Sequence, residues 1–96
     1  MTAMDKQNRL CITENIRAVV NLNFEEEIRI YLNIADDKTI LLSNDKELDL
    51  PCFGVVGFDK KYRFFIPKEI REYLNLTYES KLLVYSRKGN LVIHKV

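Results

Sequence analysis

Hydrophobic and polar residues alternate in short clusters along the second half of the chain. An apolar run at Gly54–Phe58 is followed by the polar link Asp59–Tyr62 and by a second apolar run at Arg63–Ile66. Two apolar runs joined by a short polar link are typical of a β-hairpin. This pattern therefore predicts a first hairpin that ends at Pro67.

A short helix is predicted after Pro67, because proline ends a strand and suits the first turn of a helix. Ile70, Tyr73 and Leu74 follow at i, i+3 and i+4 spacing, which places them on one face of a helix that runs to about Leu74. The β-rich runs Lys81–Tyr85 and Leu91–Ile93 come next, separated by polar residues, and predict a second hairpin. The second half is thus a ββαββ unit.

The first half repeats this pattern at an offset of 54 residues. From Asp5 to Tyr31, 10 of 27 positions carry the same residue as the position 54 further on, whereas average composition gives on the order of two. Thr13 stands in the place of Pro67 and suits the N-cap of a matching helix. The apolar face of that helix would consist of Ile16, Val19 and Val20.

The repeat predicts two units in one small domain, since 96 residues are one domain's worth of chain. The first unit covers residues 1–42, the linker 43–53 and the second unit 54–96. A unit of this size buries little surface alone. We therefore expect the two units to fold together as an α+β pseudo-dimer with an approximate two-fold axis.

The composition favours a folded protein, because 47% of the residues are hydrophobic and 30% are charged, unlike disordered chains. No stretch approaches the roughly 18 apolar residues of a membrane span, and the N-terminus is polar, unlike a signal peptide. Cys11, Cys52 and the single His94 have no metal-ligand spacing, so we expect no metal or cofactor and a cytoplasmic location. Without a catalytic constellation, we expect no enzyme activity.

The net charge of +1 hides an asymmetry between the halves. Residues 1–50 hold 6 basic and 10 acidic residues, a net charge of −4, and residues 51–96 hold 9 basic and 4 acidic residues, a net charge of +5. Such asymmetry is a hint of a nucleic-acid or membrane partner. Cys11 lies on an alternating strand at the position equivalent to Phe65, which predicts a buried thiol.

The segment Arg63–Leu76, followed by the β-rich runs at 81–85 and 91–95, resembles the AbrB/SpoVT/MazE family of bacterial regulators. In that family a strand ending in Arg-x-x-Ile-Pro leads into a helix and then a hairpin. The repeated Asp-x-x-x-Arg spacing, Asp59 to Arg63 and Asp5 to Arg9, resembles the tandem MraZ branch. The resemblance implies two ββαββ swapped-hairpin units that form an intramolecular, pseudo-dimeric, β-barrel-like domain.

The same resemblance implies a surface for duplex DNA made of basic side chains on the first hairpin and helix edge of both units. Carried over by position, its members are Arg63 and Arg71 with their equivalents Arg9 and Arg17, and Lys60, Lys61 and Lys6 lie in the hairpin links of the same motif. Lys68 would add a phosphate contact independent of base sequence if it shares this face. The sequence departs from the family pattern in having Thr13 for the first proline. Glu72 and Ala18 stand where better-known members have a second arginine, and Val56 and Thr2 replace a further basic residue.

Each candidate also has a structural interpretation. Arg63 and Arg9 either bind DNA or pair with the aspartate four residues earlier, and Arg71 and Arg17 either bind DNA or lie on a solvated helix face. The aromatic residues form either a base-stacking platform or, as we expect, core or dimer packing. They are Tyr62, Tyr73, Tyr78, Tyr85, Phe58, Phe64 and Phe65.

The favoured function is a small DNA-binding transcription regulator. The alternative is a protein-interaction module of the same fold, in which the acidic residues Glu25–Glu27, Asp36 and Asp37 dock a basic protein partner. Homo-oligomerisation fits either function, since a small domain has a thin core.

Overall fold

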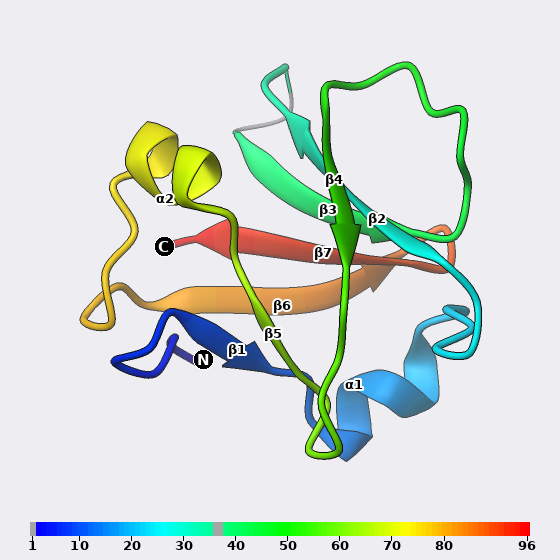
Figure 1. Cartoon of the computed structure of the whole chain (residues 1–96), viewed down its shortest axis with the longest axis horizontal. Coiled ribbons are helices and arrows are strands. Elements are labelled where there is room, and N and C mark those ends of the chain that lie inside the picture. Colours follow the sequence, from blue (N-terminus) through cyan, green and yellow to red (C-terminus); the bar gives the residue numbers. More distant parts are fainter. Residues whose placement is uncertain (1, 36–37) are drawn as a thin grey trace.

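The computed structural model describes residues 2–35 and 38–96 and shows seven strands and two short helices (Figure 1). Asp36 and Asp37, part of the acidic surface expected for a protein partner, lie outside the described residues. In chain order the elements are β1 (Arg9–Cys11), α1 (Glu14–Val19), β2 (Ile28–Asn33), β3 (Thr39–Ser43), β4 (Cys52–Val56), β5 (Arg63–Phe65), α2 (Lys68–Leu74), β6 (Leu82–Arg87) and β7 (Asn90–Lys95).

The strands form two antiparallel sheets. One has five strands in the order β4-β2-β3-β7-β6, and the other is a ribbon of β1 and β5. Over the described residues the two sheets do not close into a barrel, so the β-barrel-like part of the expected fold is wrong. The strands β1 and β5 have only three residues each and pair with each other, not with the larger sheet, over the described residues.

Strand pairing joins the two copies of the repeat at equivalent positions. In the ribbon, Leu10 lies opposite Phe64, which is the same position in the second copy. In the larger sheet, Leu41 lies opposite Val92, again its equivalent. The two outer edges show equivalent pairs as well. Val56 pairs with Ile28 on one side, and Thr2 forms a bridge with Leu82, the equivalent pair, on the other.

The predicted first hairpin is wrong in its pairing. β4 pairs with β2, and β5 pairs with β1, so the two strands flanking the polar link both have partners in the other half of the chain. The link itself is a tight turn, in which the backbone N–H of Asp59 donates to the carbonyl oxygen of Arg63 at 3.0 Å. β4 begins at Cys52 and thus includes two residues of the range 43–53 expected for the linker.

The second hairpin and the second helix are confirmed. β6 and β7 pair along their whole length, and the turn between them is reduced to Lys88 and Gly89. Both turn residues have positive φ angles, 52° and 82°, as a type I′ turn requires. α2 begins after Pro67, and α1 begins after Thr13, which has N-cap geometry but makes no hydrogen bond with its side chain.

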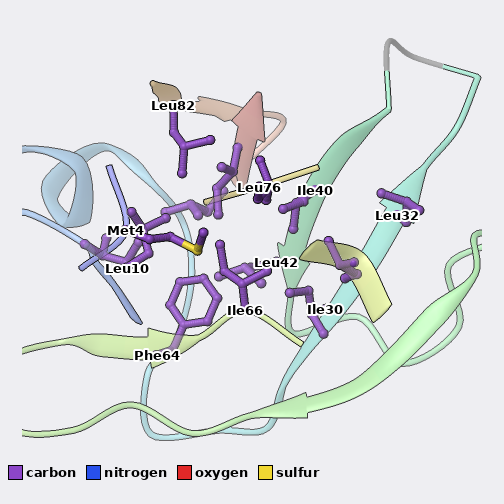
Figure 2. Close-up of a cluster of buried hydrophobic side chains, with 14 of the residues drawn as sticks. Met4, Leu10, Ile30, Leu32, Ile40, Leu42, Phe64, Ile66, Leu76 and Leu82 are labelled. Atoms are coloured by element: carbon purple, nitrogen blue, oxygen red, sulfur yellow. The ribbon is translucent and has the colours of Figure 1, made fainter. Parts of the chain in front are cut away.

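The core is one cluster of apolar side chains contributed by both halves (Figure 2). Leu10 and Phe64 project into it from the ribbon, and Ile30, Leu42 and Leu82 reach it from the larger sheet. Each of these five side chains is at most 1% exposed. Burial of this kind contributes on the order of 1.5–3 kcal/mol per large side chain, so neither half has a complete core without the other.

Three predicted core positions are wrong. Val19 and Tyr73 are 62% and 47% exposed, because α2 buries only Ile70 and Leu74 and α1 buries none of its own residues. Cys11 is exposed because it lies on the outer face of the ribbon. Of the core or dimer packing expected for the aromatic residues, core packing does not hold for the exposed Tyr62, Phe65, Tyr73 and Tyr78, and dimer packing stays a prediction.

None of the helices in the described part of the chain is long and apolar enough to cross a membrane.

Candidate nucleic-acid interface

The β1–β5 ribbon has one buried face and one outer face. Successive side chains of a strand point to opposite faces, and Leu10 and Phe64 fill the inner one. The outer face therefore carries Arg9 opposite Phe65 and Cys11 opposite Arg63. The two arginines lie at diagonal corners of this face, with the exposed Phe65 and Cys11 completing it.

Each arginine is held by the aspartate that opens its turn. The Oδ2 atoms of Asp5 and Asp59 accept from Nε of Arg9 at 2.8 Å and of Arg63 at 2.7 Å. The Oδ1 atoms accept the backbone N–H of the same arginines at 2.9 and 3.0 Å. The ion pair that was the structural interpretation of these arginines is thus present in both copies.

These ion pairs leave part of each guanidinium group open. Only Nε of Arg9 and of Arg63 has a partner among the described residues, and their side chains remain 24% and 29% exposed. The terminal nitrogens supply the two parallel N–H donors that grip phosphate or guanine. Because each aspartate accepts only from Nε of the guanidinium group, it orients that group and leaves the two terminal nitrogens open.

The two aspartates have pKa values below the ordinary value. The backbone N–H groups of Arg9 and Arg63, followed by the side chains of these arginines, hold the pKa of Asp5 and of Asp59 below 3.8. Hydrogen bonds to the charged form favour that form. The orienting carboxylates therefore stay ionised at neutral pH.

Arg17 and Arg71 donate hydrogen bonds to the backbone just before the two helices. Arg17 donates from a terminal nitrogen to the carbonyl oxygen of Ile12 at 2.6 Å, and Arg71 donates from Nε to that of Ile66 at 2.9 Å. Both side chains are half-buried, so the interpretation of a fully solvated helix face is wrong. Arg17 also stacks on Tyr62, with its guanidinium carbon 3.9 Å from the ring centroid.

The lysines lie at the two ends of the ribbon, because the turns that precede β1 and β5 are at opposite ends of an antiparallel pair (Figure 1). Lys60 and Lys61 are exposed in one turn and Lys6 in the other. Lys68, at the start of α2, is also exposed, and its Nζ lies 3.7 Å from Oε1 of Glu72. In DNA-binding proteins, exposed lysines make phosphate contacts that are independent of base sequence.

Backbone hydrogen bonds bring the helix of one copy to the turn of the other. The N–H of Ile12 donates to the carbonyl oxygen of Tyr62 at 2.9 Å, and that of Ile66 donates to the carbonyl oxygen of Asn8 at 3.2 Å. Each end of the ribbon thus collects four candidates from both copies. One group comprises Arg17, Lys60, Lys61 and Arg63, and the other Lys6, Arg9, Lys68 and Arg71.

Two residues of this surface, Tyr62 and Phe65, were expected from the sequence to pack in the core or a dimer rather than to form a stacking platform. Tyr62 is the ring under Arg17, and Phe65 is a large exposed side chain in the middle of the outer face. A signal for Phe65 exists, because its equivalent is Cys11, whereas the inner position is large and apolar in both copies, as Leu10 and Phe64. Such a difference between the copies is typical of a position that does not fill the core.

Within residues 2–35 and 38–96, no three histidine, cysteine or acidic side chains gather as a metal site would require. Comparison of the chain with protein-family models, with curated proteins and with solved structures gives no match.

Proposed function

We propose that the protein binds duplex DNA through the outer face of the β1–β5 ribbon and acts as a small transcription regulator. The observation that supports this proposal most is the matched pair Arg9 and Arg63. Each donates from Nε to an aspartate, and each has open terminal nitrogens. The major groove admits a two-stranded ribbon, and arginine recognises guanine there by two parallel hydrogen bonds. The basic groups at both ribbon ends supply contacts to the flanking phosphates.

The proposal includes the architecture behind this surface, a pseudo-dimer of two swapped-hairpin units. It is supported by the pairing of equivalent positions, Leu10 with Phe64 and Leu41 with Val92. It is also supported by β4 and β5, whose partners both lie in the other half. A two-fold arrangement suits DNA, because the phosphate backbones of a duplex are themselves related by local two-fold axes.

The test is fluorescence anisotropy with duplexes from upstream of the protein's own gene. Arg63→Ala should weaken binding by about 1–3 kcal/mol if the contact is bidentate to a base. Lys61→Ala should weaken binding to all duplexes alike and reduce the salt slope by about one unit. The matched control is Arg29→Ala, since Arg29 pairs with Glu27 through Nε at 2.9 Å but lies on β2, in the five-stranded sheet and not in the ribbon.

Circular dichroism of each variant separates lost contacts from lost folding. If the folded Arg63→Ala variant binds DNA as the parent does, or if the parent binds no duplex even at low salt, the regulator proposal is wrong. A protein-interaction module would then be the better description.

A further inference from the structure

The outer face of the β1–β5 ribbon differs between the two copies of the repeat at one position. Arg9 lies opposite Phe65 at one end of this face, and Cys11 lies opposite Arg63 at the other end. Exchange of the two copies interchanges these two pairs, since Arg9 corresponds to Arg63 and Cys11 corresponds to Phe65. Both ends of the face therefore carry an arginine, but only one of them carries an aromatic ring.

The ring of Phe65 is open to solvent. Its side chain is 63% exposed, and among the described residues it takes part in no aromatic or cation-π contact. The equivalent Cys11 is much smaller, and its thiol donates to the carbonyl oxygen of Lys61 at 3.3 Å. One end of the face thus offers a free apolar group, and the other end offers a short side chain that is already bonded to the protein.

Phe65 and Arg9 are placed to contact nearby base pairs of one DNA site. They lie directly opposite each other on the same face, and Cβ atoms of such residues are about 4.5–5.5 Å apart. Successive base pairs of a duplex rise by about 3.4 Å. In a DNA groove, the two side chains therefore reach base pairs that are one or two steps apart.

We propose that Phe65 contacts the methyl group of a thymine in the major groove and makes this thymine part of the recognised DNA site. The inference rests on the proposed binding of duplex DNA. Thymine presents its C5-methyl group in the major groove, and apolar side chains, phenylalanine among them, contact it there. The guanine bound by Arg9, whose Nε is held by Asp5, would lie one or two base pairs from this thymine.

The DNA site would consequently be an imperfect palindrome. Arg9 and Arg63 occupy equivalent positions of the ribbon, so each half-site needs a guanine. Only the half-site beside Phe65 needs the thymine, because the short thiol at the equivalent position is bonded to the turn. The protein would therefore bind its site in one preferred orientation.

The test is a deoxyuridine scan of the best-binding duplex from upstream of the protein's own gene. Deoxyuridine lacks only the methyl group of thymine, so the base pairing is unchanged. Each thymine is replaced in turn, and fluorescence anisotropy measures the affinity of each duplex. At one position, in one half-site only, the affinity should fall about fourfold, which is what burial of one carbon of this size contributes. Phe65→Ala should bind the unmodified duplex more weakly and should have no sensitive thymine.

Variants connect the sensitive thymine to the ring. Val55→Ala is the matched control, since Val55 is also apolar and 57% exposed but lies on β4, in the five-stranded sheet. It should keep the sensitivity of the parent. Cys11→Phe should add a second sensitive thymine, in the other half-site, and circular dichroism checks the fold of each variant. A folded Phe65→Ala variant that keeps the sensitive thymine would overturn the inference.

Failure of this inference is distinguishable from failure of the proposed function. If the parent binds no duplex, both are wrong. If the parent binds DNA and Arg63→Ala weakens that binding, but no thymine methyl group affects the affinity, the proposed function stands and the role of Phe65 is wrong. An equal loss of affinity at thymines in both half-sites would likewise overturn the role of Phe65, because the ring is present at one end of the ribbon only.

Discussion

At the residue scale, the repeated Asp-x-x-x-Arg turn links folding to pH. The pKa values of Asp5 and Asp59 are lower in the folded protein than the ordinary 3.8, chiefly because backbone N–H groups donate to them. A lowered folded-state pKa means stability that is present above the ordinary value and lost as the pH falls through the lowered one. The free energy of unfolding should therefore decrease from about pH 4 downward.

Asp59→Asn should flatten part of this acid dependence, since asparagine does not titrate. Urea denaturation at a series of pH values measures it. Asp49→Asn is the control, because Asp49 lies outside both turns and makes no hydrogen bond among the described residues. A slope against pH that is the same for Asp59→Asn as for the parent would contradict the role of this carboxylate.

The arginines of the helices should contribute to stability as well as to binding. Arg17→Ala removes the hydrogen bond to Ile12 and the stack on Tyr62, and it should lower the unfolding free energy by about 1–3 kcal/mol. Among the side-chain contacts of the described residues, Arg71→Ala removes only the hydrogen bond to Ile66, so it should lower the unfolding free energy less. Urea denaturation ranks the two variants, and an Arg71→Ala variant less stable than Arg17→Ala would contradict the contribution of the ring.

At the scale of elements, the two short helices bury fewer residues than their apolar spacing predicts. Ile70 is fully buried, whereas Val19 is 62% exposed, although both positions belong to predicted apolar faces. Ile70→Ala should cost about 2–5 kcal/mol by leaving a cavity. Val19→Ala should change stability by no more than about 0.5 kcal/mol. Thermal denaturation distinguishes them, and similar losses for both would mean that α1 packs differently in solution.

The elements that could be predicted from the sequence are those with local signals. α2 follows from Pro67 and the spacing of Ile70 and Leu74, and the second hairpin follows from its two β-rich runs. The pairing of β4 with β2 could not be predicted from the local pattern, because a strand's partner depends on contacts distant in the sequence. For the site, the sequence pattern predicted Arg63 as a member. The hydrogen bond from Arg71 to the carbonyl oxygen of Ile66 could not be predicted, because it depends on how the side chain lies in the folded protein.

At the scale of the whole molecule, the two halves should depend on each other for folding. The strand pairs β1–β5, β2–β4 and β3–β7 all join residues of the first half to residues of the second. Cleavage between Asn44 and Lys46 should therefore give two fragments that are unfolded separately and regain structure when mixed. Circular dichroism follows this recovery. Cooperative folding of the fragment 51–96 as a monomer would contradict the expectation, whereas its homodimerisation would agree with it.

The exchange of strands between the halves also has a kinetic consequence. Leu10 and Phe64 are paired although 53 residues separate them in the chain, so the ribbon forms only after a long loop has closed. Proteins rich in such non-local pairs fold in milliseconds to seconds, more slowly than helical bundles of similar size. During synthesis Leu10 and Ile12 are made long before β5, and they must stay without their pairing partners until the second half of the chain has emerged.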